Sequence, residues 1–336
     1  MKKHVNIPIF IPHLGCPNQC VFCNQRTISG VSEFEPYKVR KIIDEALLTV
    51  DGDTECEIAF FGGSFTGIGN DLVERLLAET ASYLESGRIS SIRCSTRPDY
   101  INPEVLAILS RYGVKNIELG IQSVSDDVLR ICKRGHTFEH TEQACRLITE
   151  YGFTLGGQMM IGLPGATLED ELRTARFIAG SGAGEARIYP TIVFKGTELC
   201  DMLADSSYSP LSLEEAVSRS AAVLDELLSA GVKVLRIGLC DSDNLHSTDS
   251  YVAGPNHAAM GELVIGRLYR KRIEEKIKTL SPGGRELTVT VSRGHTSKAI
   301  GQNRINKEYF IKEYGLRSFK VEEGEIPPYE IGITIK

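Results

Sequence analysis

The sequence predicts an α/β protein that begins with an open, partial (β/α)6 barrel of the TIM type and continues into a helical segment and a small α/β module. Short apolar or β-branched runs alternate with longer amphipathic runs as far as residue 192, which is the pattern of βαβ units in a parallel sheet. Six such repeats, roughly 30 residues apart, fall short of the eight of a closed barrel. We therefore expect the functional residues at the carboxyl ends of these six strands.

Each element of the barrel is assigned from its periodicity. The expected strands are 6–12, 56–61, 91–94, 116–120, 154–161 and 187–192. The expected helices between them are 36–49, 71–85, 102–111, 138–151 and 168–179.

The pattern changes from Ser209 onward. The next expected elements are a helix over 210–230, one more apolar strand over 232–239 and a helix over 258–279. A Pro-Gly-Gly break follows, and the tail is expected to contain a strand, a helix and two further strands over 286–335. We accordingly predict three parts: a barrel over 1–205, its extension over 206–280 and a small module over 281–336.

Composition excludes several classes of protein. The 336 residues are 42% hydrophobic and 24% charged, which is typical of a globular chain and not of a disordered or fibrous one. The net charge of −6 gives no general attraction to nucleic acid, so an RNA partner would need a local basic patch. No run approaches the about 18 apolar residues of a membrane span, and no signal peptide is recognisable. We expect a cytoplasmic protein whose nine cysteines are reduced.

Cys16, Cys20 and Cys23 carry the strongest chemical signal in the sequence. Their C-x3-C-x2-C spacing follows the first strand directly, so the three thiols share one loop at its carboxyl end. Three thiolates can hold three corners of a cubane iron–sulfur cluster and leave its fourth iron open to a small molecule. The alternative is a structural zinc site with His13 as fourth ligand, although no second ligand pair of the usual kind is present.

Further motifs follow in a fixed order along the barrel. They are Phe61-Gly-Gly-Ser-Phe65, Ser95-Thr-Arg-Pro-Asp99, Glu118-Leu-Gly-Ile-Gln-Ser123, Arg134-Gly-His-Thr137, Gln158-Met-Met-Ile-Gly-Leu-Pro-Gly165 and Arg187-Ile-Tyr-Pro190. Together with the cysteine loop, this series resembles the radical S-adenosylmethionine (SAM) superfamily, and within it the radical SAM part of the Elongator catalytic subunit family. The resemblance covers about residues 5–240, and the coproporphyrinogen oxidase group is a more distant match.

The resemblance implies a site for each cofactor. The three cysteines would hold a 4Fe-4S cluster, and SAM would chelate its fourth iron through its amino and carboxylate groups. The SAM contacts that the resemblance implies are Phe22, Gly62, Gly63, Ser64, Ser95, Gln122, Arg134, Gln158, Met160 and Gly162. Ser64 replaces the acidic residue of the general glycine turn, and Ser95 stands where many relatives have a glutamate for the ribose. No catalytic side chain or radical quencher is assigned.

The same resemblance implies the chemistry. One-electron reduction of SAM, by an external donor of the flavodoxin or ferredoxin type, would give a 5′-deoxyadenosyl radical that abstracts a hydrogen atom from the substrate. The Elongator relatives continue into an acetyltransferase domain, for which this chain is expected to have no room.

Two segments are candidates for contact with RNA. The first is a cationic cluster on the 258–279 helix formed by Arg267, Arg270, Lys271 and Arg272, whose alternative is a solvated helix face. The second is the tail, which resembles a KH RNA-binding module: a loop at Gly301-Gln-Asn-Arg304 takes the place of the Gly-x-x-Gly loop that clamps the nucleic-acid backbone in KH domains.

These observations favour a radical SAM enzyme that modifies RNA, with tRNA as the expected substrate. A radical SAM enzyme that acts on a small molecule is the first alternative. A non-catalytic iron–sulfur or zinc RNA-binding protein is the alternative from another class.

Overall fold

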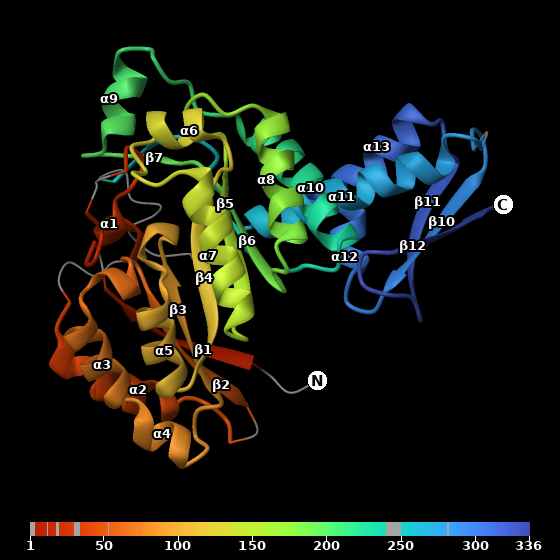
Figure 1. Ribbon diagram of the computed structural model, residues 1–336. Coiled ribbons are helices and arrows are strands. Elements are labelled where there is room, and N and C mark those ends of the chain that lie inside the picture. Colours follow the sequence, from red (N-terminus) through yellow and green to blue (C-terminus); the bar gives the residue numbers. More distant parts are fainter. Residues whose placement is uncertain are drawn as a thin grey trace. The chain divides into compact units, whose positions relative to one another are not determined.

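The first part of the chain forms one parallel sheet of seven strands, as seen in the computed structural model (Figure 1). The structure describes residues 4–11, 13–17, 20–29, 34–52, 54–239, 250–280 and 282–336. The order in the sheet is β1-β2-β3-β4-β5-β6-β8, so neighbours in sequence are neighbours in space. The strands are β1 (His4–Phe10), β2 (Glu55–Phe61), β3 (Ser91–Thr96), β4 (Val114–Gln122), β5 (Thr154–Ile161), β6 (Glu185–Pro190) and β8 (Lys233–Ile237).

The sheet confirms the partial barrel and enlarges it by one strand. The six predicted strands all form, and the additional apolar strand predicted over 232–239 joins the same sheet beside β6 as β8. The register brings the carboxyl ends of neighbouring strands to one edge: Phe10 pairs with Phe61, and Ile161 pairs with Pro190. Loops that follow different strands, among them the cysteine loop after β1 and the glycine turn after β2, are thereby gathered at this edge.

Helices connect the strands of the sheet. They are α1 (Gln25–Ser29), α2 (Val39–Leu47), α3 (Asn70–Ala78), α4 (Ala81–Glu85), α5 (Pro103–Arg111), α6 (Asp126–Ile131), α7 (Phe138–Glu150), α8 (Leu168–Gly180), α9 (Glu198–Ala204) and α10 (Leu213–Ser229). Short 3₁₀ turns lie at Pro36–Lys38, Phe65–Gly67 and Pro98–Tyr100, and β7 (Val193–Phe194) pairs with β9 (Tyr251–Ala253). The longer helices start at side-chain caps, as at Thr137 and Thr167, where capping boxes satisfy the first backbone N–H groups.

The 71–85 segment differs from the single helix that its periodicity predicts. Two helices, α3 and α4, form there because the buried Thr80 interrupts the segment, its Oγ1 donating a hydrogen bond to the carbonyl of Leu77. A side chain that bonds a nearby carbonyl competes with helix continuation. The short helices α1, α6 and α9 have two turns or fewer, which is too little for a periodic signal.

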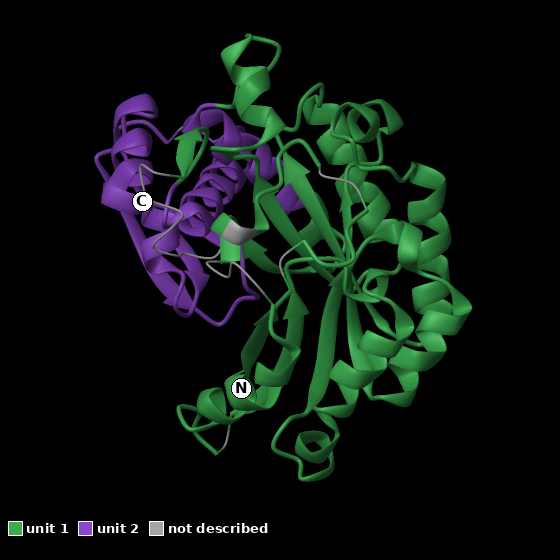
Figure 2. Ribbon diagram, turned by 90° about the vertical axis from the view of Figure 1, so that its left-hand side faces the viewer, with its two compact units in different colours: residues 1–211, 226–256 green, residues 212–225, 257–336 purple. Residues whose placement is uncertain are grey.

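Contacts divide the chain into two compact units (Figure 2). Unit 1 contains residues 1–211 and 226–256, and unit 2 contains residues 212–225 and 257–336. Helix α10 therefore contributes to both units. The predicted three-part division at residues 205 and 280 stays a prediction.

Unit 2 is built around a small mixed sheet. Its elements are α11 (Met260–Ile277), β10 (Glu286–Ser292), α12 (Thr296–Ile300), a 3₁₀ turn (Gln302–Arg304), α13 (Ile305–Glu313), β11 (Ser318–Gly324) and β12 (Ile331–Ile335). The central strand β10 runs parallel to β11 and antiparallel to β12. Its core is formed by apolar side chains of α11, the sheet and α13, among them Tyr269, Val289, Phe310 and Phe319. Within the described residues, no helix has the length and apolarity that crossing a membrane would require.

Candidate functional site

The three cysteines lie together in the loop that follows β1. Cys20 is buried at 6% exposure, and Cys16 and Cys23 are half-buried. Backbone hydrogen bonds shape the loop: the N–H of Cys16 donates to the carbonyl of His13, and that of Cys23 donates to the carbonyl of Cys20. The three thiols are free, so all three are available as thiolate ligands.

Burial and the neighbouring thiols oppose ionisation of Cys16 and Cys23. Desolvation and the neighbouring Cys20 raise the pKa of Cys16, and desolvation with both other cysteines raises the pKa of Cys23 to about 12. A bound cationic iron centre reverses this balance, because a coordinated thiol is deprotonated outright. The loop is therefore suited to a metal centre more than to three ionised thiols.

The glycine turn after β2 holds the cysteine loop in place. Gly62 adopts a φ of 106°, and the N–H of Ser64 donates to the carbonyl of Leu14 at 2.9 Å. A Cβ atom on Gly63 would lie 2.1 Å from the Leu14 carbonyl oxygen and 2.6 Å from that of Ile11. Only glycine permits this approach between the turn and the cysteine loop.

We expect a Gly63→Ala substitution to displace the cysteine loop. The new methyl group would overlap two backbone carbonyls, which cannot move aside as a flexible side chain can, so both the stability and the iron content of reconstituted protein should fall. Overpacking of this kind costs about 1–3 kcal/mol. Urea unfolding and iron analysis measure the two effects. Gly180→Ala is the control, because a Cβ atom there meets nothing within 4 Å, and equal behaviour of the two variants would contradict the prediction.

The side chain of Ser64 forms its hydrogen bonds within the chain. It is fully buried, its Oγ lies 2.8 Å from Oγ1 of Thr96, and it accepts a hydrogen bond from the N–H of Arg97. The side chain thus ties the glycine turn to the end of β3. Its predicted role in cofactor binding stays a prediction.

Several buried polar atoms near the cysteines have no partner among the described residues. They are Nε of Arg134, Nη1 of Arg97, Oε1 of Gln122 and both ring nitrogens of His136. Buried polar atoms are normally hydrogen-bonded, so a group of them marks a place for a polar ligand. Gly120 leaves the space open, because a Cβ atom there would lie 3.2 Å from both Arg134 and Gln122.

The two arginines give this area a positive charge. Arg97 is held by two hydrogen bonds of 2.9 Å to Asp99, and its Nη2 donates to the carbonyl oxygen of Arg134. Desolvation and the two arginines lower the pKa of His136 to about 3, so its imidazole is neutral at physiological pH. Neutral imidazole and cationic guanidinium groups together suit an anionic ligand such as a carboxylate.

Gln158 links Ser95 to a third residue, Glu118. Nε2 of Gln158 donates to Oγ of Ser95 at 3.0 Å and to Oε2 of Glu118 at 2.8 Å. Glu118 also receives a two-pronged contact from Arg187, at 2.6 and 2.9 Å, and a hydrogen bond from Arg93 at 2.8 Å. A buried carboxylate therefore lies one strand away from the serine that replaces the usual glutamate.

The remaining predicted contacts line an apolar part of the site. Phe22 from the cysteine loop and Met160 from β5 pack against the same buried cluster, which includes Val21 and Leu163. Gly162 follows β5 with a φ of 75°, and its N–H and carbonyl are bound by Glu171 and Tyr208. An aromatic and a thioether side chain on one apolar surface are suited to the face of a purine ring.

The comparison with known families shows the superfamily to which the chain belongs. The model of the Radical SAM superfamily matches residues 10–178, just over half of the chain, and the model of the Radical_SAM C-terminal domain matches residues 185–270. The chain belongs to the radical SAM superfamily. As a radical SAM enzyme, it uses a 4Fe-4S cluster and SAM.

Curated relatives and a solved structure agree with this assignment. The tRNA uridine(34) acetyltransferase of Methanocaldococcus infernus is 28% identical, with 60% of this chain and 46% of the relative covered. Elongator complex protein 3 of Dictyostelium discoideum is 26% identical, with 67% and 48% covered. This radical SAM chain therefore spans about half the length of these relatives. A solved Elp3 structure from Methanocaldococcus infernus has the same fold, with a TM-score of 0.58 and 22% identity over 81% of this chain and 68% of that one.

The residues present fit the cofactors of the family. Among the described residues, no three His, Cys, Asp or Glu side chains converge closely enough to hold a single metal ion. His13, the fourth ligand in the zinc interpretation, accepts a hydrogen bond at Nε2 from the N–H of Gln25. A radical SAM cluster instead needs three thiolates and an adjoining place for a charged ligand, and both features lie at this edge of the sheet.

The cationic cluster of α11 does not form the unpaired basic patch that its sequence suggests. Nη2 of Arg267 donates to Glu214, while Lys271 and Arg272 contact Asp225 at 2.7 and 2.8 Å. Nε of Arg270 donates to Oδ1 of Asn306 at 2.9 Å, and its guanidinium lies 4.3 Å from the centre of the Tyr309 ring. The acidic partners come from α10, about 50 residues earlier in the chain, which is why the pairing is not visible in the local sequence.

Sequence reasoning missed three groups that shape the site. Arg97 and His136 were recognised only as parts of motifs, and their unpartnered buried atoms become visible only in the fold. The clearest sequence signal for Glu118 is a charged residue in the middle of an apolar strand, since such residues are rarely buried unless paired. Arg93 on β3 and Arg187 on β6 give the same signal.

Proposed function

We propose that this chain is a radical SAM enzyme that modifies RNA, with tRNA as its substrate. When bound, the cluster and SAM supply a 5′-deoxyadenosyl radical that abstracts a hydrogen atom from the substrate. The chain's own residues hold and orient these groups. Cys16, Cys20 and Cys23 hold the cluster, and the polar and apolar groups around Gly120 and Met160 orient SAM. The walls of the partial barrel exclude water from the reacting atoms.

The observation that carries the RNA substrate is the kind of curated relative that this chain matches. The curated relatives named tRNA uridine(34) acetyltransferase match this chain over 60% of its length. Their activity belongs to longer proteins, so we transfer the substrate class, RNA, and not the acetyl transfer.

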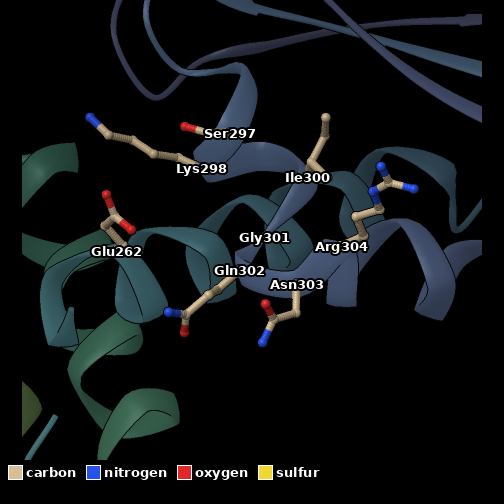
Figure 3. A pocket seen from close by; sticks show the side chains of 8 residues that line it. All are labelled: Glu262, Ser297, Lys298, Ile300, Gly301, Gln302, Asn303 and Arg304. Carbon is tan, nitrogen blue, oxygen red and sulfur yellow. The ribbon is translucent and has the colours of Figure 1, made fainter. Parts of the chain in front are cut away.

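Unit 2 supplies a second line of support. The order β10–α12–turn–α13–β11 is the strand–helix–loop–helix–strand order predicted for a KH-like module. A pocket of about 340 Å³ lies at the turn, lined by Glu262, Ser297, Lys298, Ile300, Gly301, Gln302, Asn303 and Arg304 (Figure 3). In this view Lys298 and Arg304 lie on opposite sides of Gly301.

The two cations of this pocket differ from those of α11. Neither Lys298 nor Arg304 has an ion pair or side-chain hydrogen bond with any other described residue. The buried Asn306 stabilises the turn between them, because its Nδ2 donates hydrogen bonds to the carbonyls of Gly266 and Ala299. A rigid turn with two unpaired cations suits the phosphates of a nucleic-acid backbone.

We expect the double variant Lys298→Gln/Arg304→Asn to bind single-stranded RNA more weakly and with a smaller dependence on salt. Each lost phosphate contact should reduce the slope of log K against log salt by about 0.7, the value for single strands. Asparagine is chosen because Arg304 has a φ of 64°, which asparagine tolerates. Fluorescence anisotropy at several salt concentrations gives both quantities.

Lys312→Gln is the matched control for this variant. Lys312 is exposed in the last turn of α13, so its replacement removes one charge from unit 2 but none from the pocket. An unchanged slope in the double variant, or an equal loss in Lys312→Gln, would show that the pocket does not contact RNA.

The substrate class is tested by comparing modified nucleosides in bulk tRNA from a strain that lacks the gene and from its parent. The proposal expects at least one modified nucleoside to disappear or to be replaced by its precursor, and to return when the wild-type gene is restored. An unchanged profile would remove tRNA as the substrate and favour a small molecule.

A further inference from the structure

Arg134 makes a contact that its predicted role in SAM binding does not explain. Its Nη1 lies 3.2 Å from Sγ of Cys20, and its Nη2 donates to the carbonyl oxygen of Gly120 at 2.6 Å. The side chain is 7% exposed. The guanidinium group thus contacts Cys20 through Nη1 and the end of β4 through Nη2. Its Nε has no hydrogen-bond partner among the described residues.

The position of this guanidinium is fixed from several sides. The N–H of Arg134 donates to the carbonyl of Leu129, and its own carbonyl accepts from Nη2 of Arg97 at 2.5 Å. Arg97 is in turn clamped by Asp99. Gly120 provides the room, because a Cβ atom there would lie 3.2 Å from Nη2. The contact with Cys20 is therefore built into the fold.

A buried cation against a cluster sulfur changes the energy of the two redox states by different amounts. The reduced cluster carries one more negative charge than the oxidised cluster, so the guanidinium stabilises the reduced state more strongly. Hydrogen bonds to the sulfurs and nearby charge are the protein's means of setting cluster potentials. Burial keeps this interaction from being screened by water and salt.

We propose that Arg134 is a positioning residue that raises the one-electron reduction potential of the cluster through its contact with Sγ of Cys20. The inference rests on the three cysteines being cluster ligands, as in the proposed function, but not on RNA being the substrate. The electron comes from a low-potential donor, and no bond forms or breaks when it enters. The effect is therefore present before SAM or RNA binds.

The test is a redox titration of the reconstituted full chain in the absence of SAM and RNA. Electron paramagnetic resonance monitors the reduced cluster at each potential. Arg134→Gln keeps a neutral donor and removes the charge. We expect its midpoint potential to fall by at least 59 mV, which is a tenfold change in a one-electron equilibrium. Arg130→Gln is the control: Arg130 lies four residues earlier, is 73% exposed and pairs with Asp127, so its potential should equal that of the wild type.

A loaded Arg134→Gln protein with the wild-type potential would overturn the proposal, and so would an equal shift in Arg130→Gln. If the variant takes up no cluster, a second measurement uses the wild type. Its arginines are labelled with nitrogen-15, and pulsed electron paramagnetic resonance is recorded on the reduced cluster. The proposal expects a nitrogen coupling to the cluster, and its absence would refute the contact. A wild type that takes up no cluster at all would instead refute the proposed function.

Discussion

A Cys20→Ala variant should lose the cluster, and with it all cleavage of SAM, while it keeps its fold. Cys20 lies in the loop after β1 and contacts Arg134, so its sulfur serves the site more than the barrel core. We expect a cost of about 1 kcal/mol in stability, the centre of the range for single substitutions. Iron and sulfide analysis after anaerobic reconstitution measures the loss of the cluster, and thermal unfolding measures the fold.

Cys145→Ala is the matched control for this variant. Cys145 is a buried cysteine of α7 whose pKa is raised to about 12, chiefly by desolvation, which is the behaviour of an inert core thiol. Its replacement should leave the iron content unchanged. Global unfolding of Cys20→Ala, with Cys145→Ala intact, would show that the cysteine loop is structural.

A Glu118→Gln variant should be the most destabilised single substitution in the barrel. The carboxylate is 1% exposed and pairs with Arg187 through both oxygens and with Arg93 through one. Its removal leaves Arg187 buried without this carboxylate, and breaking a buried pair in this way costs about 3–5 kcal/mol. Gln158 would also lose an acceptor, so SAM binding should weaken.

Urea unfolding at neutral pH measures the free energy of unfolding, with Glu142→Gln as control because Glu142 is exposed on α7.

The pH dependence of this free energy is the second measurement. Burial by itself would raise the pKa of Glu118, but Arg187, Gln158 and Arg93 outweigh it and hold the pKa below 4.5. A depressed pKa adds stability that is present above about pH 4.5 and is lost below it, so the difference between wild type and variant should narrow on acidification. A difference that grows on acidification would contradict this explanation.

The fold of unit 1 could be predicted from the sequence because each of its strands is a short local run of apolar or β-branched residues. A largely buried strand such as β5 has a mostly apolar run, interrupted here by Gln158, and its boundaries agree with the predicted range of 154–161. The cysteine loop was equally visible, since its three ligands lie within eight residues. Features carried by neighbouring residues are the ones that sequence patterns report.

The network around Glu118 could not be predicted in the same way. Its partners Arg93 and Arg187 are 25 and 69 residues away, and the contacts depend on the register between strands. The same reason applies to α11, whose cations were candidates for contact with RNA or for a solvated helix face and are paired with Glu214 and Asp225. Residues 240–249 lie outside the described residues.

The most direct test of the central claim is the yield of 5′-deoxyadenosine when the anaerobically reconstituted protein is given dithionite and SAM, with and without bulk tRNA from a strain that lacks the gene. The account predicts 5′-deoxyadenosine from the wild type, none from Cys20→Ala, and a higher yield when this tRNA is present. A wild type that holds a reducible cluster but forms no 5′-deoxyadenosine under either condition would contradict it.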